Sequence, residues 1–471
     1  MAFYLILCFL GMALFGGIIG WRRVLRWDSI AGFYLAIFCL AFFIRPWYIF
    51  DIQWFRQFYQ FGVSPFQGWW VAEDLAIKMG LAVIVGLGCF AAAYRWILTR
   101  PAREPLSAAR PLDSQDSAIL RKRLVILSLA LAAVALVSIL VYLPFPGVRD
   151  ASEAVWVNLP DASGRGFSGS TGYLVNLNLL AIPASIIFFL ATGNIFGAIA
   201  LAFPFLLCRL WWGQGRQTLF TFSICLLLTA GLISRLQPLK RLRTVIIGVI
   251  ILAGILAVFG VLGRDRGAIQ DYYYTRSGPI TKYEESTRDA YLADVVGFEI
   301  SLHWLKYAPE KFPFEWGASY LYQLFILPIP RIWWPEKHNI FAPYTPATFK
   351  EDMLYLWGAA PGCIGDAWEN GGWLGIIILF SLAGGLGGLA QRAKDWKSYP
   401  VTGLLLFVVA YPYAISAVRD GLSVLTATLY ALGIPILLTY LIERRLIKSQ
   451  DQRYVLKKPF KKTFATKMNR E

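Results

Sequence analysis

The sequence predicts an all-α polytopic membrane protein with about eleven transmembrane helices and one large loop on the outer side. Three observations lead to this prediction. First, 57% of the 471 residues are hydrophobic and only 16% are charged, and the mean hydropathy is +0.54. Soluble domains carry about a quarter charged residues, so a bilayer accounts for this composition better than a soluble core. The other two observations are a series of apolar stretches and an uneven distribution of Lys and Arg.

The apolar stretches are close to the length of about 20 residues that a helix needs to cross the hydrocarbon core. They cover residues 2–20, 29–50, 71–98, 124–143, 172–191, 194–210, 217–233, 244–262, 372–390, 401–417 and 421–441. The first stretch begins near Met1 without a basic leader or a small-residue cleavage site, which predicts a retained span and no signal peptide. The fifth to seventh are short and closely spaced, so the predicted number is about eleven.

The positive-inside rule orients these spans. With the C-terminal tail inside, the inner segments hold 26 Lys and Arg residues, whereas the four short outer segments hold six. The chain then divides into an N-terminal bundle of about eight spans (1–262), a large periplasmic loop (263–371), about three C-terminal spans (372–441) and a basic cytoplasmic tail (442–471). Most of the net charge of +16 lies on the inner side, which indicates contact with anionic lipid and argues against a nucleic-acid partner.

The large loop is too long for a simple connection. Residues 288–307 have the apolar periodicity of a helix. Residues 320–330 are apolar but short and end in Pro-Ile-Pro, which predicts a helix lying on or dipping into the outer interface. No internal repeat of the kind found in many transporters is present.

The chain contains no Walker-type nucleotide motif and no Cys or His cluster with metal-ligand spacing. We therefore expect no cofactor and no metal, and a substrate that arrives already activated. The positive-inside rule disfavours arginine on the outer side, and six of the arginines predicted there stand out because they lie near span ends or beside glycines. They are Arg209, Arg216, Arg264, Arg266, Arg331 and Arg419. Guanidinium binds phosphate oxygens bidentately, so the group predicts a pyrophosphate pocket; singly, each is also compatible with contact to lipid phosphates.

Four residues of the loop are candidate general bases. Glu299 and His303 are four residues apart in a predicted helix, so they share a face. Asp366 and Glu369 come just before a predicted span. The alternatives are a surface ion pair for the first two, and helix capping for the second two. His303 is slightly favoured, because its unperturbed pKa of about 6.5 suits a base and Glu299 can orient its ring.

Several motifs in the C-terminal half resemble those of the Wzy-type O-antigen and exopolysaccharide polymerases of bacteria. The family pattern Gly-x-Ser-Tyr … Pro-Arg-x-x-Trp-Pro-x-Lys is matched by Gly317-Ala318-Ser319-Tyr320 and by Pro330-Arg331-Ile332-Trp333-Trp334-Pro335-Glu336-Lys337. Gln214-Gly215-Arg216, Gly365-Asp366, Asn370-Gly371-Gly372 and Arg419-Asp420-Gly421 are also similar to that family. The chain departs from it at His338, where proline is common, and at Asp366, where glutamate is frequent.

The resemblance implies a glycosyltransferase of the GT-C type in the bacterial inner membrane. Such enzymes polymerise polyprenyl-pyrophosphate-linked oligosaccharide repeat units at the periplasmic face, together with a flippase and a chain-length regulator of the same pathway. A base deprotonates the acceptor hydroxyl, and arginines neutralise the departing lipid pyrophosphate. Two alternatives remain open: an O-antigen ligase, which shares the architecture, and a lipid-linked oligosaccharide flippase. A flippase is expected to spread cations through its spans, where this chain has only Arg45, Lys78 and Arg95.

Overall fold

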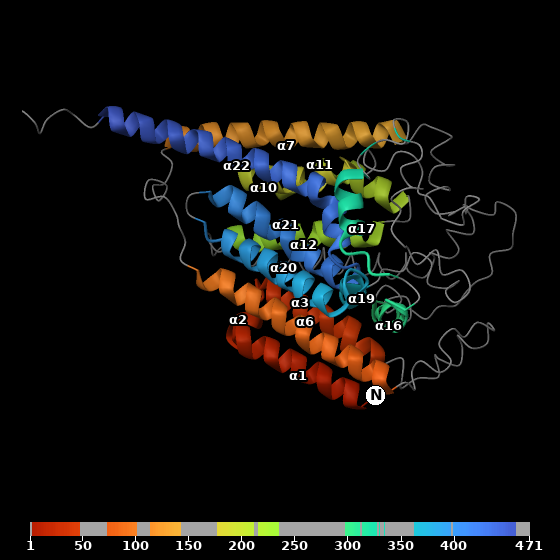
Figure 1. The fold of residues 1–471 in the computed structure, drawn as a ribbon. Helices are drawn as coiled ribbons and strands as arrows, with labels where there is room; N and C mark the ends of the chain where they lie inside the picture. The colour runs from red at the N-terminus through yellow and green to blue at the C-terminus, as the bar shows by residue number, and fades with distance from the viewer. Residues whose placement is uncertain are drawn as a thin grey trace, which may run out of the picture.

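The computed structural model describes residues 2–47, 73–100, 114–142, 177–211, 215–234, 297–310, 313–326, 329, 334, 362–396 and 399–457. Every regular element in these ranges is a helix (Figure 1). Among the described residues, five helices are long and apolar enough to cross a membrane: Ile30–Trp47, Asp74–Thr99, Ser114–Leu140, Gly372–Ala393 and Pro400–Arg419. Four shorter helices are also apolar. The chain is thus an all-α protein with the helices of a multi-pass membrane protein.

Ten of the eleven apolar stretches form helices, and the remaining stretch, 244–262, lies outside the described residues. They are α1 (Ala2–Ile19), α3 (Ile30–Cys39) with its π-helical continuation (Leu40–Ile44), α6 (Glu73–Thr99), α7 (Ser114–Tyr142), α10 (Ala181–Thr192), α11 (Ile195–Trp211), α12 (Gly215–Ser234), α20 (Gly372–Ala393), α21 (Pro400–Arg419) and α22 (Ser423–Lys457). A short helix α2 (Trp21–Val24) and a 3₁₀ turn (Leu177–Leu180) precede α3 and α10.

Two helices extend beyond the predicted apolar stretches. Helix α7 begins at Ser114, about three turns before residue 124, and α22 continues to Lys457, well past residue 441. Hydropathy marks where the chain leaves lipid, whereas a helix ends only where its backbone loses its hydrogen bonds. In the extension of α22, Glu443 is buried and accepts hydrogen bonds from the N–H groups of Val401 (3.0 Å) and Thr402 (2.9 Å). This carboxylate caps the start of α21 and holds the extension of α22 against the bundle.

Helices α1, α6 and α20 form the closest packing of the bundle (Figure 1). Gly384 and Gly388 of α20 lie against the backbone of Phe90 and Tyr94 in α6. Their spacing of four residues puts both on one face, and the missing side chains let the two helix backbones approach. A Cβ at position 384 would overlap the carbonyl oxygen of Phe90, whereas at neighbouring Gly385 it would have nothing within 4 Å.

We expect Gly384→Ala to destabilise the protein by about 1–3 kcal/mol, the usual cost of overpacking. Gly385→Ala on the same helix should leave the stability unchanged or raise it slightly, because alanine has the higher helix propensity. Thermal unfolding of the purified proteins in detergent measures both changes. Equal unfolding temperatures for the two variants would contradict the packing role of Gly384.

One end of the bundle is organised by Asp28, which is fully buried between α2 and α3. Its carboxylate accepts hydrogen bonds from Lys394 Nζ (2.8 Å) and Arg26 Nε (3.0 Å). Burial raises the pKa of Asp28, but these two cations outweigh it and lower the pKa to about 2. Gln391 links the same loop to α20, because it accepts from the N–H of Ile30 (2.8 Å) and donates to the carbonyl of Asp28. We call this the Asp28 end; the charge distribution predicts that it is the inner one.

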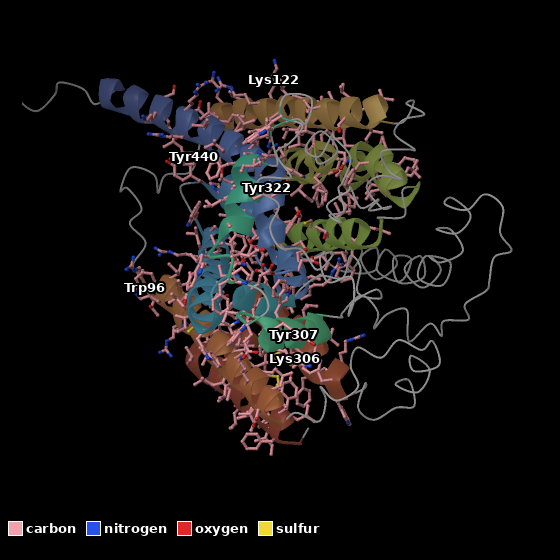
Figure 2. The ribbon with its side chains drawn as sticks, turned by 45° about the vertical axis from the view of Figure 1, so that its right-hand side comes forward. Trp96, Lys122, Lys306, Tyr307, Tyr322 and Tyr440 are labelled. Atoms are coloured by element: carbon pink, nitrogen blue, oxygen red, sulfur yellow. The ribbon has the colours of Figure 1, made fainter. Side chains whose placement is uncertain are left out.

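The opposite end carries three short helical elements that are not spans. They are α16 (Gly297–Tyr307), α17 (Ala318–Leu321) with its π-helical continuation (Tyr322–Ile326), and α19 (Gly362–Glu369), all at the right of Figure 1. Figure 2 labels Lys306 and Tyr307 on α16 and Trp96 near the end of α6 at the other side of the bundle. Lys78 in α6 donates to the carbonyl of Leu305 (2.7 Å), which satisfies the C-terminus of α16 and fixes it to the bundle.

Candidate active site

Helix α19 is held in place by close contact with α16. Ser301 Oγ donates to the carbonyl of Gly297 (2.6 Å) and accepts from the N–H of Gly365 (3.0 Å). Gly365 has no side chain, so α19 lies directly on the backbone of Ser301. Trp368 Nε1 donates to the carbonyl of Ala308 (3.2 Å) at the other end of the contact. The two helices therefore form one unit, and this unit fixes the side chains of Asp366 and Glu369 at the end of the bundle.

Asp366 is the centre of the site. Its side chain is buried, with 3% of the residue surface exposed. One carboxylate oxygen, Oδ2, accepts hydrogen bonds from the hydroxyl of Tyr320 (2.5 Å) and from the N–H of Leu422 (3.0 Å). The first donor belongs to α17 and the second to the start of α22, so Asp366 joins segments that are 46 and 56 residues away in the chain.

Asn370 positions the Gly-Ala-Ser-Tyr segment next to Asp366. Its Oδ1 accepts from the N–H of Gly317 (2.9 Å) and from Ser319 Oγ (3.2 Å), and its Nδ2 donates to the carbonyl of Asp366 (2.9 Å). All three contacts use the amide of one buried side chain. Asn370 thus helps to position Tyr320 relative to Asp366, the carboxylate that accepts its hydrogen bond.

The turn between α21 and α22 closes the site from the other side. Gly421 has a φ of +77°, a conformation that side chains with a Cβ rarely adopt. A Cβ at this position would overlap the carboxyl group of Asp366. The preceding residues place a cation and a second acid here: Arg419 Nε donates to Asp420 Oδ1 (2.9 Å), with the Arg419 side chain about one third exposed (32%). Glycine is therefore required at 421 by both backbone conformation and space.

The surroundings of Asp366 bring its titration close to neutral pH. Burial raises its pKa, and the hydrogen bonds from Tyr320 and the Leu422 N–H oppose this by stabilising the charged form. The negative charges of Glu315 and Asp420 add to the rise, and the resulting pKa is about 7. At pH 7 the carboxyl group is therefore about half ionised, which suits a group that takes up and releases a proton.

Glu369 behaves differently, although it is only three residues away. Burial raises the pKa of Glu369 well above its usual value, and the charges of Glu315 and Asp366 and a hydrogen bond with Glu315 raise it further. Glu369 therefore keeps its proton to a higher pH than an exposed glutamate does. Glu315 is also buried, and its N–H donates to the carbonyl of Glu369 (2.9 Å). Two neighbouring buried acids whose pKa values are both raised are a candidate acid–base site.

Of the sequence-predicted site residues, Asp366 and Glu369 lie together in α19, and Arg419 ends α21, two residues before Gly421. Three others, Arg264, Arg266 and Arg331, lie outside the described residues. Arg209 near the end of α11 and Arg216 at the start of α12 are in described helices, but their side chains are not described. Arg419 is the one of the six arginines whose side chain is described, and the pyrophosphate pocket stays a prediction.

Glu299 and His303 lie in α16, and their side chains are likewise outside the described part. Of the four candidate bases, Asp366 and Glu369 are the two for which the structure describes a site.

Sequence reasoning missed Glu315, the acid that shifts the pKa of both Asp366 and Glu369. It stands just before the Trp316–Tyr320 motif, and no spacing or composition signal distinguishes it. Asp420 and Gly421 belong to the motif Arg419-Asp420-Gly421, but nothing in the sequence connects them with Asp366.

Among the described residues, no three His, Cys, Asp or Glu side chains are arranged to hold a metal ion.

Comparison with known proteins adds no assignment to this site. No family model, no curated protein and no solved structure matches the chain.

Proposed function

We propose that this chain is a GT-C-like membrane glycosyltransferase with about eleven spans that polymerises polyprenyl-pyrophosphate-linked oligosaccharide units at the outer face of the bacterial inner membrane. One observation carries the proposal. Three of the motifs that resemble the Wzy-type polymerases, around Tyr320, Asp366 and Arg419, are far apart in sequence and meet around a single buried carboxylate.

In this proposal the Asp366 carboxylate takes the proton from a hydroxyl group of the acceptor sugar. The hydroxyl oxygen attacks the anomeric carbon of the donor chain, and the bond from that carbon to the lipid pyrophosphate breaks. The pyrophosphate leaves as an anion and is neutralised by Arg419, whose guanidinium N–H groups can donate to phosphate oxygens. Tyr320 holds Asp366 through the 2.5 Å hydrogen bond. The raised pKa of Glu369 favours its neutral form and so limits the negative charge of the site.

The contacts of the cations in the predicted spans support a flippase less well than a glycosyltransferase. Of the three cations in the predicted spans, Lys78 donates to the carbonyl of Leu305 and Arg95 to the carbonyl of Ile18. Both therefore complete the hydrogen bonding of neighbouring helices, which is a structural use of the charge. An O-antigen ligase remains the nearest alternative, since it would use the same base and the same leaving group.

The test is an in vitro reaction with the purified protein in nanodiscs and a lipid-linked repeat unit. Products longer than one unit, formed without any other acceptor and in the presence of a chelator, support the proposal. Transfer only when a second lipid acceptor is added would indicate a ligase. Translocation of the substrate without a new glycosidic bond would indicate a flippase, and loss of activity with chelator would give a metal the role assigned to arginine.

Arg419→Ala is expected to lower the polymerisation rate about ten- to a hundredfold, because a charge-assisted hydrogen bond to phosphate contributes roughly 1.5–3 kcal/mol. Arg419→Lys should restore only part of the rate, since lysine keeps the charge but loses the bidentate geometry. Lys306→Ala removes an exposed cation from the same end of the bundle and serves as the control. Full activity of Arg419→Ala would remove Arg419 from the proposed pocket.

The rate should depend on pH through Asp366. Its ionised form is the base, so activity should rise as the pH increases through about 7. The hydrogen bond from Tyr320 lowers the pKa; Tyr320→Phe should therefore raise it and move the acid limb of the pH–rate profile to higher pH. Tyr411→Phe, which removes a tyrosine hydroxyl hydrogen bond to Trp27 at the Asp28 end (2.9 Å), should leave the limb in place. An unchanged limb in Tyr320→Phe would contradict the assignment of that limb to Asp366.

A further inference from the structure

The segment Glu315–Ile326, which carries Tyr320, has two distinct sides. Ser319 and Tyr322 are buried against the protein, with 8% and 7% of their surface exposed. Trp316, Leu321 and Phe325 are large apolar residues that are 66%, 58% and 65% exposed. Leu321 and Phe325 are four residues apart, so they lie on one face of the segment. The side that binds Asp366 is therefore polar and buried, and the other side is apolar and uncovered.

Both ends of the segment are attached to membrane helices. At one end, the ring of Trp316 lies against Gly371, the residue before α20 begins. At the other end, the hydroxyl of Tyr430 donates to the carbonyl of Leu324. Tyr430 is seven residues inside α22, which corresponds to about 10 Å along the helix axis. The segment thus starts at the level where α20 begins and ends about two turns deeper along α22.

The direction of the segment agrees with these attachments. In Figure 1, α17 stands upright at a steep angle to α20, α21 and α22, on the side of the bundle where α16 and α19 also lie. Figure 2 shows Tyr322 near the middle of this segment, above the α16 residues Lys306 and Tyr307. A short helix at a steep angle to the spans, with a Trp at the boundary and apolar residues beyond it, is typical of a segment lying in a membrane interface.

We propose that the Trp316–Leu321–Phe325 face is inserted into the lipid of the leaflet on the Asp366 side, so that the wall of the site that carries Tyr320 is anchored in the bilayer. Lipid is the occupant because one anchoring helix, α20, is long and apolar enough to cross a membrane, and the other, α22, contains most of the predicted span 421–441. A second copy of the chain fits less well, since three side chains expose a few hundred Å² at most, below the ~800 Å² per partner of a stable interface. The proposal depends on the membrane location and not on the proposed reaction.

The test uses single cysteines labelled with an environment-sensitive fluorophore, with the unsubstituted protein labelled in parallel as the blank. Leu321→Cys and Phe325→Cys report on the face, Leu382→Cys on the exposed side of α20 is the lipid-facing control, and Lys306→Cys on α16 is the aqueous control. Each protein is placed in nanodiscs of ordinary phospholipid or of phospholipid brominated in the acyl chains, without substrate.

Quenching by brominated lipid at 321 and 325, comparable to that at 382 and absent at 306, is the expected result. Quenching that requires added polyprenyl pyrophosphate would overturn the proposal in favour of the substrate's own tail. No quenching, with emission that changes with protein concentration, would overturn it in favour of a second copy. Because no turnover is measured, failure here is distinguishable from failure of the proposed function.

Discussion

Asp366→Asn is expected to lower the polymerisation rate by about 10²- to 10⁴-fold, the contribution of a positioned general base. Asparagine has nearly the same shape, and its amide oxygen can still accept the hydrogen bonds from Tyr320 and the Leu422 N–H. The substitution therefore removes the ability to take a proton and leaves the packing of α16, α17 and α19 in place. The measurement is the initial rate of chain elongation by the purified variant in nanodiscs.

The control for this variant is Asp74→Asn, which removes an exposed carboxylate in the first turn of α6. It should elongate chains at the parental rate, and the thermal stability of both variants should match the parent or, for Asp366→Asn, exceed it. If Asp366→Asn elongates chains at the parental rate, Asp366 is not the base. His303→Ala, tested in the same assay, then becomes the deciding variant.

Gly421→Ala is expected to reduce activity by at least about a hundredfold, the effect of displacing a reacting group by roughly 1 Å. A Cβ at 421 would occupy the space of the Asp366 carboxyl group, so either the turn or the carboxyl group has to move. The left-handed conformation at 421 adds a cost of about 1 kcal/mol for alanine. Initial rate and thermal stability, measured on the same preparation, separate loss of geometry from loss of fold.

Gly193→Ala is the matched control for Gly421→Ala. Gly193 ends α10 with a φ of +71°, close to that of Gly421, but a Cβ there would have nothing within 4 Å. It therefore carries the same backbone strain without the contact with Asp366, and it should keep the parental activity. Equal activities of the two variants would mean that the contact between Gly421 and Asp366 does not matter for the reaction.

The sequence by itself determined the helical class and the places of most helices. Apolar stretches long enough for a span have few alternatives, because every backbone polar group in lipid must be bonded within its own segment. The sequence also indicated Asp366, Glu369 and Arg419 as candidate site residues. Charged side chains next to predicted spans are rare because they are energetically unfavourable near lipid, so they stand out in the sequence. Hydropathy did not predict the N-terminal end of α7 or the C-terminal end of α22, because polar residues continue each helix beyond its apolar stretch.

Only the tertiary structure decided which of the candidates meet. Asp366, Tyr320 and Gly421 are separated by dozens of residues, and their contact depends on how α19, α17 and the α21–α22 turn pack at one end of the bundle. The same packing brings Glu315 next to Glu369, and its charge contributes to the raised pKa values of both Asp366 and Glu369. Burial and neighbouring charge are properties of the folded chain, and no spacing along the sequence encodes them.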